Sequence, residues 1–455
     1  MRKCGMIWTC LWLVSLWCGC AESAEAQVRD DEYKDFLSSI QTEFYAFEDS
    51  INRDFANYLE QAWQEFTVYE GTEPPVYAAG ATCLEAKESA PLPSDGSFFG
   101  SSLQFPFPIG GMLSLPDLSE KVVADGWRKL GAEDFSAFFK AYTHYSRQFC
   151  LNDWGNFLLL KYATQQRYAS LSSHEQTLFL FYLLNLAGYK AKIGRVGTDR
   201  LVLLIPFQEE IYKIPFIRVG GRKYYIMDLS SPQLKKLYSI VPDYPKSDRT
   251  ISLQIPMALD FPVDKVKRDF TGKYPCSLQL NSNLLNFYAS FPLCDLSVYF
   301  GASLSDGFKR QMDELVKPPL KGKKCSEQMA WLLDFVQQTF THKPDIEVHK
   351  SEVYYFPEET AFYPYADCED LSVFLSWLVR RYITNNVLIL YYPNHVAIAV
   401  ERYDGYKGEV CKPPVKYVFS AISSSSIFVP KNKTYDDTRR SCRNYYVLQG
   451  TQINL

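Results

Sequence analysis

Residues 363–400 read YPYADCEDLSVFLSWLVRRYITNNVLILYYPNHVAIAV, and this stretch indicates how the second half of the chain folds. After Cys368, apolar residues recur at the spacing of one buried helical face. The four that define this face are Phe374, Leu375, Leu378 and Val379. Residues 387–391 form a short apolar run, which is typical of a buried strand. A turn at 392–394 leads to a second apolar run at 396–400, so the stretch predicts a helix followed by two strands.

Two reactive side chains stand at the starts of these predicted elements. Cys368 comes where the helix begins, and His395 comes 27 residues later, where the second strand begins. The unpaired amides of a helix start and a neighbouring imidazolium both stabilise a thiolate, so the pair predicts a nucleophile and its base. The acidic residues Asp367, Glu369 and Asp370 act against this, because negative charge raises a thiol pKa unless the carboxylates point away. The other interpretation of Cys368 is a buried, unreactive core cysteine.

These motifs resemble those of a known superfamily. DCED at Asp367–Asp370, the run YPNHVAIAV at 392–400 and PEET at Pro357–Thr360 look like motifs of the transglutaminase-like (papain-like) cysteine superfamily. They are similar to the secreted transglutaminase-like proteins of Bacteroidetes in particular. The resemblance implies Cys368 as nucleophile and His395 as base. It also implies a third residue, an aspartate, after the next strand, and the matching position here is Ala421. A missing acid leaves the imidazole without its orienting partner.

The chain also contains a weak internal repeat. The run Leu178–Leu183 matches Val373–Leu378 at an offset of 195, and Lys223–Asp228 matches Lys416–Ala421 at an offset of 193. The simplest explanation is an internal duplication. At the same offset, Ser173 replaces the cysteine and Arg200 replaces the histidine, so the first copy lacks both the nucleophile and the base.

The predicted fold class is therefore α+β, with two tandem transglutaminase-like (papain-like) α/β units, the first degenerate, after a long N-terminal helical segment. The predicted divisions are a signal peptide at 1–26, the N-terminal helical segment at 27–70, a connector with β structure at 71–135, the degenerate copy at 136–245, a β-rich linking segment at 246–310, and the unit with Cys368 and His395 at 311–455.

Smaller patterns refine these divisions. Aromatic and aliphatic residues recur every three to five positions over 31–69, which predicts one long or divided amphipathic helix. Short apolar runs between turn residues predict strands in Phe98–Leu115, at Ile251–Ile255 and at Leu296–Phe300. The period returns to that of a helix over Glu327–Phe340.

The first residues predict an address outside the cytoplasm. Arg2 and Lys3 precede an apolar run and an A-x-A site at Ala24–Ala26, as in a signal peptide cleaved before Gln27. Alternatively, Gly19-Cys20 ends a lipobox, which would make Cys20 a lipid anchor. The chain is thus expected to be secreted, periplasmic or held at the cell surface. After the signal no run of 18 apolar residues occurs, so no transmembrane segment is predicted.

Composition restricts the classes of function. With 47% hydrophobic and 22% charged residues, the 455-residue chain has a globular composition. Its net charge of −4 and its lack of a basic run argue against nucleic-acid partners. Of 12 cysteines, four lie in the predicted signal, and no C-x-x-C pair suggests zinc. The sequence therefore predicts neither a cofactor nor a metal site.

Three hypotheses of function remain. The first is a cysteine hydrolase (peptidase or amidase) or acyltransferase that attacks a peptide or protein amide through a Cys368 thioester, with His395 as base. The second is an inactive binding or scaffold protein, because the third triad position is Ala421. The third is a glycan-associated surface protein whose many aromatic side chains stack on sugars.

Overall fold

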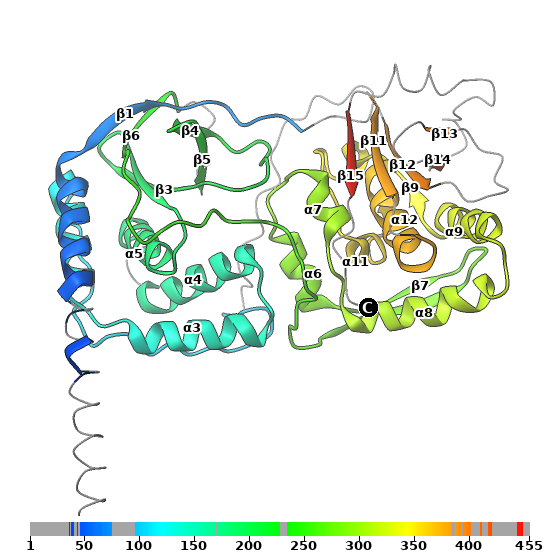
Figure 1. The fold of residues 1–455 in the computed structure, drawn as a ribbon, viewed down its shortest axis with the longest axis horizontal. Coiled ribbons are helices and arrows are strands. Elements are labelled where there is room, and N and C mark those ends of the chain that lie inside the picture. The colour runs from blue at the N-terminus through cyan, green and yellow to red at the C-terminus, as the bar shows by residue number, and fades with distance from the viewer. Residues whose placement is uncertain are drawn as a thin grey trace, which may run out of the picture.

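The computed structural model gives a mixed α+β protein, drawn in Figure 1. The described residues are 36, 38–40, 43, 46–74, 96–169, 172–227, 234–384, 387–392, 395–401, 410–411, 417–420 and 444–448. The predicted signal peptide, Cys20 and Ala421 lie outside these residues.

The first half of the chain begins with a helical layer. Residues 46–61 are helical, and four helices follow between residues 120 and 186. They are α2 (Glu120–Gly131), α3 (Ser136–Gln148), α4 (Asp153–Tyr168) and α5 (Ser173–Leu186). Helix α5 is apolar on nearly every side, because α4 and α2 cover it on one side and strand β3 on the other.

An antiparallel sheet of six strands packs on these helices. Its strand order is β1-β6-β2-β3-β5-β4. Beyond the end of β1, Tyr69 pairs with Phe216 at the start of β4, so the two edges approach and the sheet is nearly closed, like a barrel. The strands are β1 (Trp63–Thr67), β2 (Lys192–Val196), β3 (Arg200–Ile205), β4 (Phe216–Val219), β5 (Arg222–Met227) and β6 (Lys236–Ile240).

A segment of hairpin and helices connects the two halves. The hairpin of β7 and β8 is followed by three helices, of which α8 runs along the lower side of the second half in Figure 1. These elements are β7 (Lys265–Phe270), β8 (Cys276–Asn281), α6 (Ser282–Ala289), α7 (Leu296–Gly301) and α8 (Asp306–Leu320).

The second half repeats the combination of helices and an antiparallel sheet. Helix α12 packs on β12 and is covered by α7, α9 and α11, and its apolar residues from Leu371 to Val379 are buried. The helices are α9 (Cys325–Thr339), α10 (Asp345–Val348), α11 (Pro357–Thr360) and α12 (Cys368–Tyr382). The strands are β9 (Thr341–His342), β10 (Tyr365–Ala366), β11 (Val387–Tyr392), β12 (His395–Glu401), β13 (Val410–Cys411), β14 (Tyr417–Ser420) and β15 (Asn444–Leu448).

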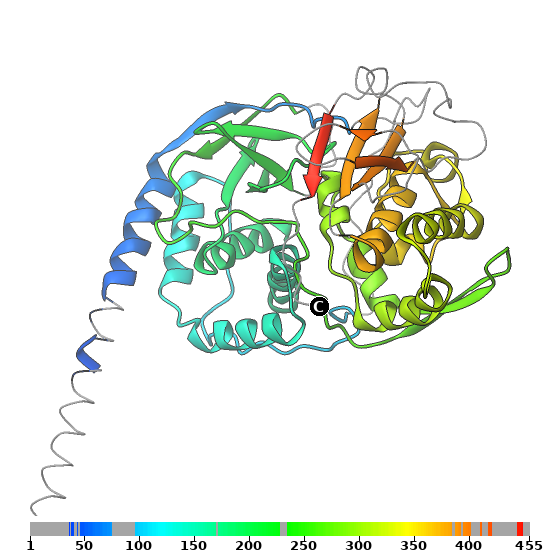
Figure 2. The ribbon, with the colours of Figure 1, turned by 45° about the vertical axis from the view of Figure 1, so that its right-hand side comes forward.

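The two large sheets share one strand order. In the second sheet the order is β15-β11-β12-β14-β13, and in the first it is β6-β2-β3-β5-β4 with β1 added beside β6. All neighbouring strands in both are antiparallel. In each half, the sheet follows a helix that packs on it, α5 in the first and α12 in the second. Figure 2 shows the two halves side by side.

The predicted N-terminal helix over 31–69 is too long. The helix ends at residue 61, and Trp63–Thr67 form strand β1, which pairs with β6. Trp63 and Phe66 continue the helical spacing of the sequence. The segment nevertheless forms a strand, because it pairs with β6 at the edge of the barrel-like sheet. Tertiary pairing here overrides local periodicity.

Three of the predicted strand regions are also wrong. Phe98–Leu115 contains only the bridge between Phe98 and Ser101, and residues 102–115 have no regular structure. Leu296–Phe300 lies in helix α7, because the Asp295 carboxylate accepts a hydrogen bond from the Ser297 N–H and caps a helix start. Residues 252–255 form no strand either. The helix predicted over Glu327–Phe340 is confirmed as α9.

The N-terminal helix is held to the first half by Phe55, which offers a stability test. The Phe55 ring is 1% exposed and lies 4.8 Å from the Trp127 ring and 5.3 Å from the Tyr244 ring, centroid to centroid. Phe55→Ala should lower the free energy of unfolding by about 3–5 kcal/mol, because it leaves a cavity among aromatic rings. Urea denaturation measures this. Tyr58→Ala, on the exposed side of the same helix, is the control, and equal losses in the two variants would contradict the packing.

Candidate functional site

Helix α12 places Cys368 at its first position through a capping box. The Asp367 carboxylate accepts hydrogen bonds from the N–H groups of Glu369 (3.1 Å) and Asp370 (3.4 Å). In return, the Asp370 carboxylate accepts one from the Asp367 N–H at 3.3 Å. These bonds satisfy backbone donors that a helix start leaves without partners. The sequence DCED therefore fixes where the helix begins, and with it the position of the thiol.

The first turn of α12 is tied to the start of β12. The Ser372 hydroxyl donates a hydrogen bond to the carbonyl oxygen of Val396 at 3.1 Å, and the Val396 backbone also acts on the Cys368 thiol. His395 is the first residue of β12 and pairs with Tyr392 of β11. The structure thus brings Cys368 beside the residue that follows His395. The His395 ring lies outside the described side chains, so its contact with the sulfur stays a prediction.

The surroundings of the thiol favour its protonated form. Cys368 is partly buried, and its sulfur lies 2.8 Å from Oε2 of Glu369. Burial raises the pKa of the thiol, and the negative charge of Asp367 raises it further. The hydrogen bond to Glu369 and the Val396 backbone act in the opposite direction and only reduce that rise. Without a further positive charge, Cys368 is a thiol rather than a thiolate.

A cluster of buried carboxylates surrounds this helix start. Besides Asp367, Glu369 and Asp370, it contains Asp345 and Glu352, and each of the five is at most 7% exposed. Burial raises the pKa of every one, that of Glu352 to about 7, and the negative charge of Asp367 adds to the rise in the other four. Two groups of three have oxygens close enough to hold one metal ion: Asp345, Asp367 and Asp370, and Glu352, Asp367 and Glu369.

Backbone amides partner some of these carboxylates and leave others without a donor. The Asp345 carboxylate accepts a hydrogen bond from the Val353 N–H at 2.6 Å, and that of Asp370 accepts one from the Tyr355 N–H at 2.8 Å. In contrast, Oε1 of Glu352 and Oε1 of Glu369 are buried without a hydrogen-bond partner. The cluster is thus only partly satisfied by the protein.

Sequence reasoning found three members of the cluster and missed two. It placed Asp367, Glu369 and Asp370 beside the thiol, but it gave no role to Asp345 or Glu352. The available signal is that segment 345–359 carries five acidic residues among aromatic ones, DIEVHKSEVYYFPEE. Two histidines lie near the cluster. His342 lowers the pKa of Asp367, and Nε2 of His349 is 2.5 Å from the Tyr355 hydroxyl.

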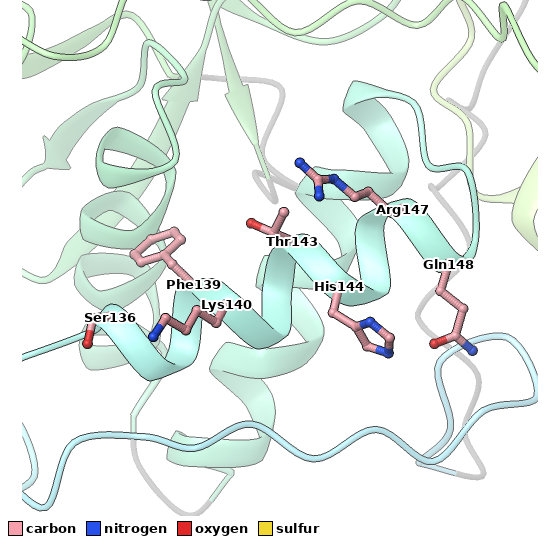
Figure 3. Close-up of a pocket in the computed structure, with 7 residues that line it drawn as sticks. All are labelled: Ser136, Phe139, Lys140, Thr143, His144, Arg147 and Gln148. Carbon is pink, nitrogen blue, oxygen red and sulfur yellow. The ribbon is translucent and has the colours of Figure 1, made fainter. Parts of the chain in front are cut away.

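Another hollow lies in the first half, along α3. This open cavity has a volume of about 770 Å³. Figure 3 shows its lining side chains, among them Lys140, His144 and Arg147. Its lining residues include neither a thiol nor a carboxylate, so it offers no arrangement comparable to that at Cys368.

Comparison of the chain with family models, curated proteins and solved structures finds no match. Among the described residues, no helix combines the length and the apolar character needed to cross a bilayer.

Glu358, on α11 beside the cluster, provides a pH-dependent test. Burial raises the pKa of Glu358 to about 7, while its Oε1 accepts the Ser305 N–H at 2.6 Å. The pKa of Glu358 is higher in the folded chain than in the unfolded chain, where it is near 4.5. The carboxyl therefore contributes fully to the free energy of unfolding at pH values below 4.5. The contribution is lost between pH about 4.5 and about 7. Glu358→Gln should remove this dependence and raise the free energy of unfolding above pH 7 by about 3 kcal/mol.

Chemical denaturation from pH 4 to 8 measures the difference. Glu314→Gln removes an exposed carboxylate of α8 and should change nothing. If the wild type and Glu358→Gln show the same pH dependence, ionisation of Glu358 does not lower the free energy of unfolding, and the prediction is wrong.

Proposed function

We propose that the chain is a secreted transglutaminase-like protein made of two copies of one α+β unit, of which the second carries a cysteine-dependent site. The shared strand order of the two sheets supports the duplication. The offset of 195 residues relates the starts of α5 and α12 and those of β3 and β12. A chance likeness of apolar helices would not extend to the strand order.

The same correspondence separates the chemistry of the two copies. Ser173 is the first residue of α5 and Arg200 the first of β3, just as Cys368 and His395 begin α12 and β12. The first copy therefore has neither a thiol nor an imidazole at the equivalent places. Its role in this proposal is structural, and the reaction belongs to the second copy.

The site best fits a cysteine hydrolase or acyltransferase that acts on peptide or protein amides. The observation that carries this is the hydrogen bond that joins the first turn of α12 to Val396, next to His395. In the reaction, His395 takes the proton of the Cys368 thiol and the sulfur attacks the amide carbonyl. The amine leaves with that proton and a thioester forms. Water or a second amine then releases the acyl group.

The second candidate is a binding protein of the same fold without catalysis. It is favoured by the carboxylates around Cys368, since burial and Asp367 raise the pKa of the thiol. It is also favoured by Ala421, which replaces the aspartate that the family resemblance implies. The two candidates differ in whether His395 activates the sulfur.

Alkylation separates them. If His395 acts as base, His395→Ala should slow the reaction of Cys368 with iodoacetamide at neutral pH by about tenfold or more. Peptide mass spectrometry follows the labelling, and Cys276 on β8, which is partly buried, serves as the internal standard. If the ratio of Cys368 to Cys276 labelling is the same in the wild type and in His395→Ala, Cys368 and His395 do not form a dyad. The second candidate, a binding protein without catalysis, would then be the better description.

The missing acid gives a second test. The native chain should hydrolyse amides weakly, since loss of the third triad member costs about 10⁴ in rate in a serine protease. Ala421→Asp should raise hydrolysis of a peptide mixture if the new carboxylate reaches the His395 ring. The control is Ala421→Asp combined with Cys368→Ala, which should abolish the gain. A gain that survives without the sulfur would contradict the assigned nucleophile.

A further inference from the structure

We propose that Glu352, Asp367 and Glu369 bind one divalent cation of the kind that prefers oxygen ligands, namely Ca²⁺, Mg²⁺ or Mn²⁺. The inference goes beyond the cysteine chemistry and does not depend on it. It would hold equally if the chain were a binding protein.

The three carboxylates have the spacing of a coordination shell. One oxygen from each lies within 4.8 Å of the others. A Ca²⁺ ion binds oxygens at 2.3–2.6 Å, so ligands on opposite sides of it are about 5 Å apart. The three oxygens are therefore close enough together to share one ion.

Two unpartnered oxygens show that this group needs a positive charge or a proton. Oε1 of Glu352 and Oε1 of Glu369 are buried without a hydrogen-bond partner, and the two residues are 7% and 1% exposed. A buried carboxylate oxygen without a donor is costly, so such groups are normally paired or bind a metal. The neighbouring group with Asp345 and Asp370 differs, because backbone amides bind all three of its carboxylates, whereas in the trio they bind only that of Asp367.

The protein itself supplies little countercharge. Within the described residues, Glu352, Asp367 and Glu369 form no ion pair with a lysine, arginine or histidine. The cationic groups that act on the trio electrostatically are Lys213, near Glu352, and His342, near Asp367. Three carboxylates and no direct cationic partner leave room for a divalent ion.

The donor set selects the class of metal. All three ligands are carboxylates, which suit hard cations such as Ca²⁺, Mg²⁺ and Mn²⁺. The Cys368 sulfur does not belong to the group of close ligand atoms, and a softer ion such as Zn²⁺ would use it.

The direct test is calorimetric titration of the purified full chain, freed of metal by EDTA, with CaCl₂, MgCl₂ and MnCl₂ in turn. We expect saturable binding of one ion per chain for at least one of them. Glu352→Gln should weaken that binding by about tenfold or more, because it removes a charged ligand. Glu358→Gln, which also removes a buried carboxylate but lies outside the trio, should bind as the wild type does.

Thermal unfolding gives an independent readout with a crossed pattern. In EDTA, Glu352→Gln should melt at or above the wild-type temperature, because it relieves repulsion among buried carboxylates. With the ion present, the melting temperature of the wild type should rise and that of Glu352→Gln should not, since an ion that binds only the folded state stabilises it. If Glu352→Gln does not fold, Glu369→Gln takes its place. Cys368→Ala should keep the affinity of the wild type.

Three results would overturn the proposal. The first is no saturable binding of any of the three ions up to about 10 mM, above the weakest usual calcium affinities. The second is binding that Glu352→Gln and Glu369→Gln leave unchanged, which would place the ion elsewhere. The third is binding that is lost in Cys368→Ala, which would assign the ion to a site that uses the sulfur.

Discussion

The second half of the chain depends on the burial of the first turn of α12. A helix start leaves backbone N–H groups that need acceptors, and Asp367 meets this need with its carboxylate. Because α7, α9 and α11 cover the helix on the side away from the sheet, the capping carboxylate is removed from water. The segment before it follows the same principle, since Asp345 and Asp370 bind the amides of Val353 and Tyr355. The Val353 bond holds residues 345–355 together, and the Tyr355 bond connects them to the helix.

This arrangement also sets the limits of the chemistry. A thiol at a helix start is usually made more acidic by its position, yet here burial and Asp367 raise the pKa of Cys368. The capping carboxylates offset the positive end of the helix dipole, so the dipole stabilises a Cys368 thiolate only weakly. Any process that makes the thiol reactive must bring positive charge close to Cys368, whether from an imidazole, a substrate or an ion.

Local patterns predicted the helices well and the buried acids poorly. The apolar period of α9 and α12 is carried by residues close in sequence, so it can be read without the fold. The strand predicted at Leu296–Phe300 is a helix, because a short apolar run fits either period and the Asp295 cap decides between them. Trp63–Thr67 became a strand through pairing with a segment far along the chain. Glu352 could not be recognised, since acids are read as solvated and only tertiary packing buries this one.

The added strand β1 has a consequence for the order of folding. It comes from the N-terminal part of the chain, yet its partner β6 ends at Ile240, after the remaining strands of the first sheet. During synthesis β1 therefore emerges long before any partner exists, and it must wait for the rest of the sheet. Pairing over such a sequence separation closes a large loop and is slow compared with helix formation. Until β1 docks, the open edge of β6 is a site where a second chain could add a strand, so chaperone binding or swapped dimers would arise at this step.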